Sequence, residues 1–180
     1  MDRGEPWVAA LLEELARTGR VGAEAVQFVR DHNIRVRLRN QSSGARWILR
    51  RRIELHPRYA KGPPSAPYSL SLVVHEVQHA RQCWARALSV YGELEAWQVQ
   101  FAFLRTLVDS YPGSPEQQRL ITDLVALPLG WDREVLRVAR TLMRRYAGRA
   151  YRVDLLPLYP LPLELAYLIT RRPPAVVSES

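Results

Sequence analysis

The sequence is poor in cysteine and in long apolar runs, and both absences narrow the class of protein. Its 180 residues include one cysteine, Cys83, so no disulfide can form within the chain, which favours a reducing compartment. No segment reaches the roughly 18 uninterrupted apolar residues of a membrane-spanning helix. The first residues lack the basic and then apolar layout of a secretory signal. We therefore expect a cytoplasmic protein that does not enter a membrane.

Lysine is almost missing as well, because Lys61 is the single example and arginine carries the other positive charges. Lysine and arginine together number 26 against 18 acidic residues, which gives a net charge of +8. A basic surface attracts anionic partners in a salt-dependent manner. A solvated arginine-rich surface explains this charge more simply, so nucleic acid is the less favoured partner.

Length and apolar patterning predict one α+β domain over residues 1–180. The hydrophobic content of 47% and the charged content of 24% are ordinary globular values. Apolar residues at helical spacing predict a helical N-terminal part, residues 5–32. Apolar residues then alternate with arginines, which predicts a small twisted antiparallel or mixed sheet over residues 34–56. Within it we expect a hairpin turn at residues 40–44, followed by one longer strand over residues 45–55, with a kink or bulge at residues 50–52 as an open alternative.

Helices are predicted for most of the remaining chain. Metal-site helices should cover residues 69–109, and Ser69 or Ser71 is the expected N-cap of the first one. C-terminal helices and a proline-rich tail should occupy residues 114–175. Ser114 and Asp132 are the expected N-caps of two helices. In the tail, three prolines forbid a continuous helix: Pro157, Pro160 and Pro162.

The segment His75-Glu76-Val77-Gln78-His79 matches H-E-x-x-H, a pattern that places two zinc ligands and a general base on one helical turn. Residues four apart on a helix have Cβ atoms about 5–6 Å apart, so both imidazoles can reach one tetrahedral ion. The apolar stripe that includes Val73 and Val77 lies on the other side of this helix. We therefore expect both histidines to face a cleft. Two exposed histidines on an ordinary helix are the alternative.

A catalytic zinc site requires a third protein ligand, and residues after His79 do not supply another histidine. Glu93 and Glu95 are the candidates. On a helix over residues 90–109, Glu93 flanks the buried side, whereas Glu95 should point to solvent. We prefer Glu93. Glu95 stays open, because 13 residues between His79 and Glu93 leave little room for the chain to return unless the motif helix ends near Trp84.

The motif followed by Glu93-Leu94-Glu95-Ala96 resembles the gluzincin branch of zinc metallopeptidases. This branch includes thermolysin, the CAAX-processing peptidases and compact regulatory peptidases with a Glu-x-x-Ala signature. The resemblance covers about residues 34–105. It implies a zincin-like fold, a Zn²⁺ ion held by His75, His79 and Glu93, and Glu76 as the general base.

Two further expectations follow from the same resemblance. The family fold places the edge of a sheet beside the motif helix to hold a peptide, and residues 53–56 are the natural candidate for that edge. Trp97 stands where the CAAX-processing branch has an aspartate, so the supporting carboxylate of that branch is missing.

Residues near the motif have an ordinary structural interpretation and a functional alternative. We interpret Gln82 as a surface side chain, Cys83 as a small buried thiol and His56 as a loop histidine. The alternatives are orientation of His79 by Gln82, redox sensitivity of Cys83 and substrate binding by His56. Tyr91 could donate a hydrogen bond to a tetrahedral intermediate.

The sequence as a whole predicts a zinc-dependent metallopeptidase that hydrolyses peptide or protein substrates, with a zinc-bound water activated by Glu76. The alternative is a non-catalytic regulatory protein with a structural or vestigial zinc site, which binds nucleic acid or an acidic partner. Neither the substrate nor the oligomeric state is indicated.

Overall fold

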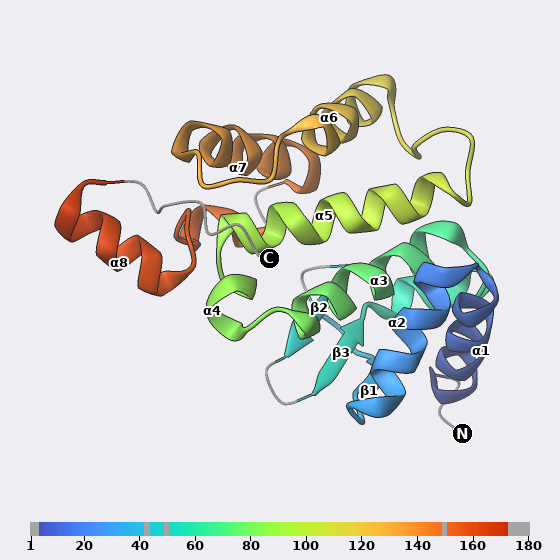
Figure 1. Cartoon of the computed structure of the whole chain (residues 1–180). Helices are drawn as coiled ribbons and strands as arrows, with labels where there is room; N and C mark the ends of the chain where they lie inside the picture. Colours follow the sequence, from blue (N-terminus) through green and yellow to red (C-terminus); the bar gives the residue numbers. More distant parts are fainter. Residues whose placement is uncertain (1–3, 42–43, 49–50, 149–150, 173–180) are drawn as a thin grey trace. The chain divides into compact units, whose positions relative to one another are not determined.

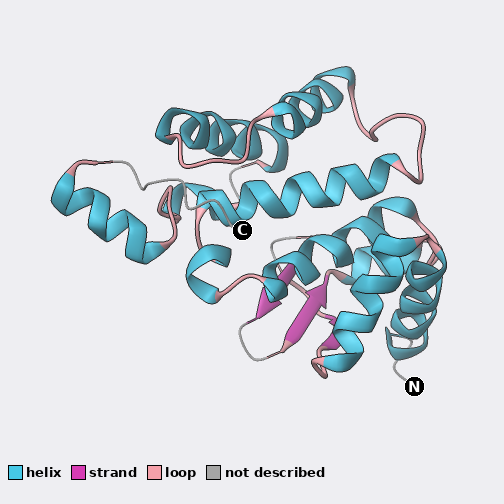
Figure 2. Cartoon of the chain, in the orientation of Figure 1, coloured by secondary structure: helices cyan, strands magenta, loops and turns pink. Residues whose placement is uncertain are grey.

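The computed structural model describes residues 4–41, 44–48, 51–148 and 151–172. These residues form eight α-helices and one three-stranded mixed sheet, which confirms the α+β class (Figures 1 and 2). The helices are α1 (Gly4–Arg17), α2 (Arg20–Asp31), α3 (Pro67–Arg81), α4 (Trp84–Ala87), α5 (Val90–Arg105), α6 (Pro115–Ala126), α7 (Arg133–Ala147) and α8 (Leu161–Thr170). The strands are β1 (Arg35–Leu38), β2 (Ala45–Ile48) and β3 (Arg52–Leu55), and short 3-10 helices occur at η1 (Pro57–Lys61) and η2 (Arg152–Leu155).

Contacts within the chain define two compact units. The first comprises Met1–Arg81 and Val99–Tyr111, and the second comprises Gln82–Gln98 and Pro112–Ser180. The boundary therefore crosses the chain three times, and one crossing, between Gln98 and Val99, lies within the continuous helix α5. A division by contacts does not test independent folding, so the single domain stays a prediction.

The sheet of the first unit has the order β1-β3-β2, in which β3 runs parallel to β1 and antiparallel to β2 (Figure 1). The predicted hairpin turn at residues 40–44 is therefore wrong, since β1 and β2 are not neighbours; residues 42–43 lie outside the described part. The single strand over residues 45–55 is also wrong, because the chain reverses between β2 and β3. Arg51 has a φ of 57° there, a left-handed conformation without the glycine or asparagine that announces most turns.

The apolar face of the sheet forms the core of the first unit together with α1, α2 and α3. Ile53 and Leu55 of β3 are fully buried and belong to the same cluster as Val73 and Val77 of α3. Helix α3 contacts both β2 and β3, so the sheet packs on the motif helix. The predicted edge at residues 53–56 is wrong, because β3 is the central strand and β2 is the edge strand against α3.

Helix α3 begins earlier than predicted and ends where the chain must turn. The carbonyl of Ala66 accepts a hydrogen bond from the amide of Leu70 at 3.1 Å, so the helix starts at Pro67. Proline suits a first helical position because its fixed φ is already helical. Ser69 and Ser71 are thus buried inside the helix, and the prediction that either one caps it is wrong.

The second unit agrees closely with the local sequence signals. Ser114 and Gln117 form a reciprocal capping box at the start of α6. The carboxylate of Asp132 accepts the amides of Glu134 and Val135 at 2.8 and 3.2 Å at the start of α7. The tail forms η2 and α8 with an extended segment between them, as its prolines predict. Among the described residues, none of the helices is both long enough and apolar enough to cross a membrane.

Candidate metal centre

The H-E-x-x-H residues lie on α3 and are buried. His75 and His79 are each 6% exposed, and Glu76 is 4% exposed. The alternative of two exposed histidines is therefore wrong, and α3 is buried on the histidine side as well as on the side of the apolar stripe. Between residues 67 and 78, Glu76 is the one charged side chain, so the helix is apolar or weakly polar on all sides. Helices of this composition are normally buried all round, and this signal was available in the sequence.

The two imidazoles converge at one point beside α3. Their Nε2 atoms are 3.1 Å apart, and the ring planes meet at 79° with centroids separated by 4.7 Å. Ligand atoms placed tetrahedrally about 2.0–2.1 Å from a zinc ion are about 3.4 Å apart. The separation of the two nitrogens therefore suits a shared ion without rearrangement of the helix.

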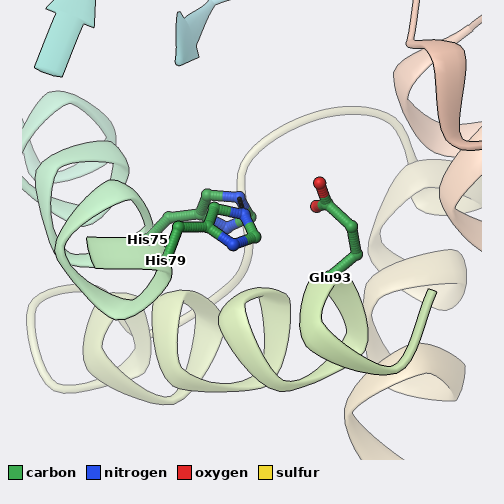
Figure 3. A group of neighbouring side chains, drawn as sticks. All are labelled: His75, His79 and Glu93. Atoms are coloured by element: carbon green, nitrogen blue, oxygen red, sulfur yellow. Dashed lines mark hydrogen bonds between the residues drawn. The ribbon is translucent and has the colours of Figure 1, made fainter. Parts of the chain in front are cut away.

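Glu93 joins the two histidines in one group of possible ligands. One ligand atom from each of His75, His79 and Glu93 lies within 4.8 Å of the others, and Figure 3 shows the imidazole rings directed toward the side on which the carboxylate lies. Among the described residues, this group could hold a metal ion. The donors also fit zinc, which is commonly bound by imidazole nitrogen and carboxylate oxygen.

The chain between His79 and Glu93 turns back within the 13 residues that separate them. Helix α3 ends at Arg81, before Trp84, and the one-turn helix α4 separates it from α5. The hydroxyl of Ser89 accepts the amide of Gly92 at 3.0 Å and so caps the start of α5. Glu93 is thereby fixed in the first turn of that helix.

Gly92 permits the close approach of α4 and α5. A Cβ atom at this position would lie 2.0 Å from the carbonyl oxygen of Arg86, a backbone atom that cannot move aside easily. The first two amides of α5, from Val90 and Tyr91, donate to the carbonyls of Pro157 and Leu158 at 2.8 and 3.1 Å. The proline-rich tail thus satisfies the free amides at the helix start and helps to hold the turn that carries Glu93.

Glu95 is engaged in a different network and does not belong to the group. Arg86 donates from Nε and Nη2 to its two carboxylate oxygens at 2.9 and 3.0 Å. Gln82 donates to Glu95 at 2.7 Å and to the carbonyl of Gly92 at 3.0 Å. The predictions that Glu95 points to solvent and that Gln82 is a surface side chain are therefore wrong, since the glutamate side chain is 18% exposed and Gln82 is 9% exposed.

Tyr151 is a residue of the site that the sequence did not reveal. Its hydroxyl donates to the carboxylate of Glu93, and the indole nitrogen of Trp97 donates to the same hydroxyl at 2.8 Å. Tyr151 precedes η2 and lies 58 residues after Glu93 in the sequence, so no local pattern connects the two. Trp97 therefore contacts Glu93 indirectly, by a hydrogen bond to the tyrosine hydroxyl that itself donates to the Glu93 carboxylate.

The other residues considered near the motif have structural surroundings. Cys83 is exposed, so the prediction of a buried thiol is wrong. His56 caps η1 by accepting the amide of Arg58 at 3.0 Å, which agrees with a loop histidine. Tyr91 stacks on Trp131 with ring centroids 4.2 Å apart.

No family model, curated protein or solved structure matches this chain. Membership of the zincin family is therefore a hypothesis that depends on the motif and on the geometry of His75, His79 and Glu93.

Proposed function

We propose that this protein is a zinc-dependent metallopeptidase of the gluzincin type. The convergence of His75, His79 and Glu93, whose ligand atoms lie within 4.8 Å of one another, is the observation that carries the proposal. Two imidazoles and one carboxylate make three protein ligands, the number that leaves a fourth position open for water or substrate in catalytic zinc sites.

Zinc in such a site supplies a Lewis acid for the peptide carbonyl and a bound water of lowered pKa. Glu76 follows His75 on the same helical turn, and its carboxylate would accept a proton from the attacking water. The same carboxylate would then release that proton to the leaving amine. Tyr151 would hold one carboxylate oxygen of Glu93 by its hydrogen bond and so orient the ligand, as groups bonded to metal ligands commonly do.

Strand β2 is the proposed support for the substrate backbone. It is an edge strand of the three-stranded sheet and packs against α3. An extended peptide can add to such an edge through main-chain hydrogen bonds. In this proposal β2, and not residues 53–56, is the sheet edge that holds the substrate peptide beside the motif helix.

Metal analysis combined with two variants tests the proposal. Protein purified without chelator should contain about one equivalent of zinc, and His75→Ala should lose most of it. Glu76→Gln should retain the metal and lose turnover of a mixed peptide library by about 100-fold or more, the scale of general acid–base catalysis. Glu95→Gln, a matched change two residues from Glu93, should retain the metal. Absence of zinc from the parent protein after reconstitution, or normal cleavage by Glu76→Gln, would contradict the proposal.

A non-catalytic zinc protein is the second candidate, and the burial of His75, Glu76 and His79 favours it. A buried site can serve stability alone, in which case Glu76 has no chemical role. This candidate predicts that the parent protein and Glu76→Gln bind zinc equally and that neither cleaves peptides, whereas His75→Ala lowers thermal stability.

A further inference from the structure

A groove of about 730 Å³ lies between β1 and α1 in the first unit. It is lined by Glu5 and Val8 of α1 and by residues 35–39, which include the whole of β1. In the described part of the sheet, β1 pairs with β3 alone and is the edge strand opposite to β2, as the strand order in Figure 1 shows.

The hydrogen bonds of β1 show which of its main-chain groups are paired with β3. The amides of Arg35 and Arg39 donate to the carbonyls of Arg51 and Leu55 at 2.9 and 2.8 Å, so these odd-numbered residues face β3. Successive residues of a strand direct their N–H and C=O groups to opposite sides. The N–H and C=O groups of Val36 and Leu38 therefore point away from β3, toward the side of β1 that no other strand of the described sheet occupies.

Successive side chains of β1 point to opposite faces of the sheet. Arg35, Arg37 and Arg39 extend from one face of the sheet and are exposed, whereas Val36 and Leu38 are half-buried on the other face. Arg37 and Arg39 are held in place by hydrogen bonds to Glu54. Glu54 is itself shared with Arg46, so positive charge predominates on this face in spite of the carboxylate.

We propose that the β1 edge binds an extended acidic peptide segment of a partner protein by strand addition. Carboxylate side chains at alternate positions of the segment would lie beside Arg35, Arg37 and Arg39. The intervening apolar side chains would lie beside Val36 and Leu38. This site is on a different edge from the proposed metal centre and does not depend on it.

A peptide fits these features better than a nucleic acid does. Phosphates could pair with the three arginines, but a sugar-phosphate chain has no alternating N–H and C=O groups to pair with Val36 and Leu38. Another strand supplies those groups at the required two-residue repeat, which is the usual basis of strand addition. The three guanidinium groups also outnumber the single carboxylate of Glu5 in the groove, so an acidic segment is favoured over a basic one.

The test uses a labelled peptide of alternating glutamate and valine, followed by fluorescence anisotropy and by amide hydrogen exchange. We expect saturable binding that slows hydrogen exchange at the amides of Val36 and Leu38. The same peptide methylated on alternate backbone nitrogens should bind at least tenfold more weakly at equal charge. Arg35→Glu should weaken binding by tenfold or more. Arg20→Glu, an equal charge change on a side chain that is 86% exposed in the same unit, should change it less than twofold.

Three results would overturn the proposal. The first is equal affinity for the methylated peptide, since charge alone would then explain binding. The second is tighter binding of a single-stranded oligonucleotide of equal charge that is weakened by Arg35→Glu, since the edge would then be a nucleic-acid site. The third is an absence of binding by the parent protein.

Discussion

Replacement of Glu54 by glutamine tests how much the ion pairs between Glu54 and three arginines of the sheet region stabilise the fold. The carboxylate of Glu54 is 0% exposed and accepts hydrogen bonds from three arginines. Arg37 and Arg46 each donate from Nε at 3.0 Å to a different oxygen, and Arg39 donates at 3.3 Å. Burial by itself raises the pKa of Glu54, but the hydrogen bonds from Arg37, Arg46 and Arg39 outweigh it and lower the pKa from 4.5 to about 2.

The magnitude follows from that pKa. Each pKa unit corresponds to about 1.4 kcal/mol, so a pKa lowered from 4.5 to about 2 sets an upper limit of about 3.4 kcal/mol on the stabilisation. The side chains of Arg37, Arg39 and Arg46 are 43, 52 and 45% exposed, so solvent screens part of this attraction. We expect Glu54→Gln to lower the free energy of unfolding by about 2 kcal/mol at pH 6 after this screening. For a chain of this length that is a decrease in Tm of about 4–8 °C.

The pH dependence provides the sharper check. The carboxyl group of Glu54 has a lower pKa in the folded protein than in the unfolded chain, so its stabilisation is complete above about pH 4.5 and is lost as the pH falls toward 2. Urea unfolding followed by circular dichroism at pH 6, 4 and 3 should therefore show a difference between parent and variant that shrinks with acidity. Glu24→Gln, on an exposed helix surface, serves as the control. A Glu54→Gln variant as stable as the parent at pH 6, or a difference that stays constant down to pH 2.5, would refute the reasoning.

Three other substitutions test the support of Glu93 and the second unit. Tyr151→Phe removes the hydrogen bond to Glu93 and should weaken zinc binding by about 10–100-fold in competition with a chelator, with an unchanged circular dichroism spectrum. Gly92→Ala places a Cβ atom 2.0 Å from the carbonyl oxygen of Arg86 and should lower the free energy of unfolding in urea by about 1–3 kcal/mol. The same variant should bind zinc more weakly. Ser114→Ala removes the capping box of α6 and should lower stability by about 1 kcal/mol without any change in zinc affinity.

The features that the sequence predicted correctly depend on neighbouring residues. The capping box at Ser114 and the cap at Asp132 need partners only two or three positions away, so the pattern contains the whole interaction. The histidine pair of α3 is local in the same sense, because four positions on a helix bring His75 and His79 together.

The features that were missed depend on distant residues or on unusual local conformations. The order β1-β3-β2 requires a parallel pairing between strands that are not consecutive, which the alternation of arginines and apolar residues cannot specify. Arg51, which directly precedes β3, has a left-handed conformation that arginine rarely adopts. The hydrogen bond from Tyr151 to Glu93 connects residues 58 positions apart.

Glu93 and Glu95 show why partners, and not helical position alone, decide which carboxylate can serve a metal. Arg86 covers both oxygens of Glu95, so an ion at that residue would have to displace a paired guanidinium and leave a positive charge without its counter-charge. Tyr151 donates from a neutral hydroxyl to one oxygen of Glu93. That bond orients the carboxylate without cancelling its charge, and it is the kind of support expected for a metal ligand. To make Glu95 the available metal ligand in place of Glu93, one would therefore have to change the partners Arg86 and Tyr151, and not the two glutamates.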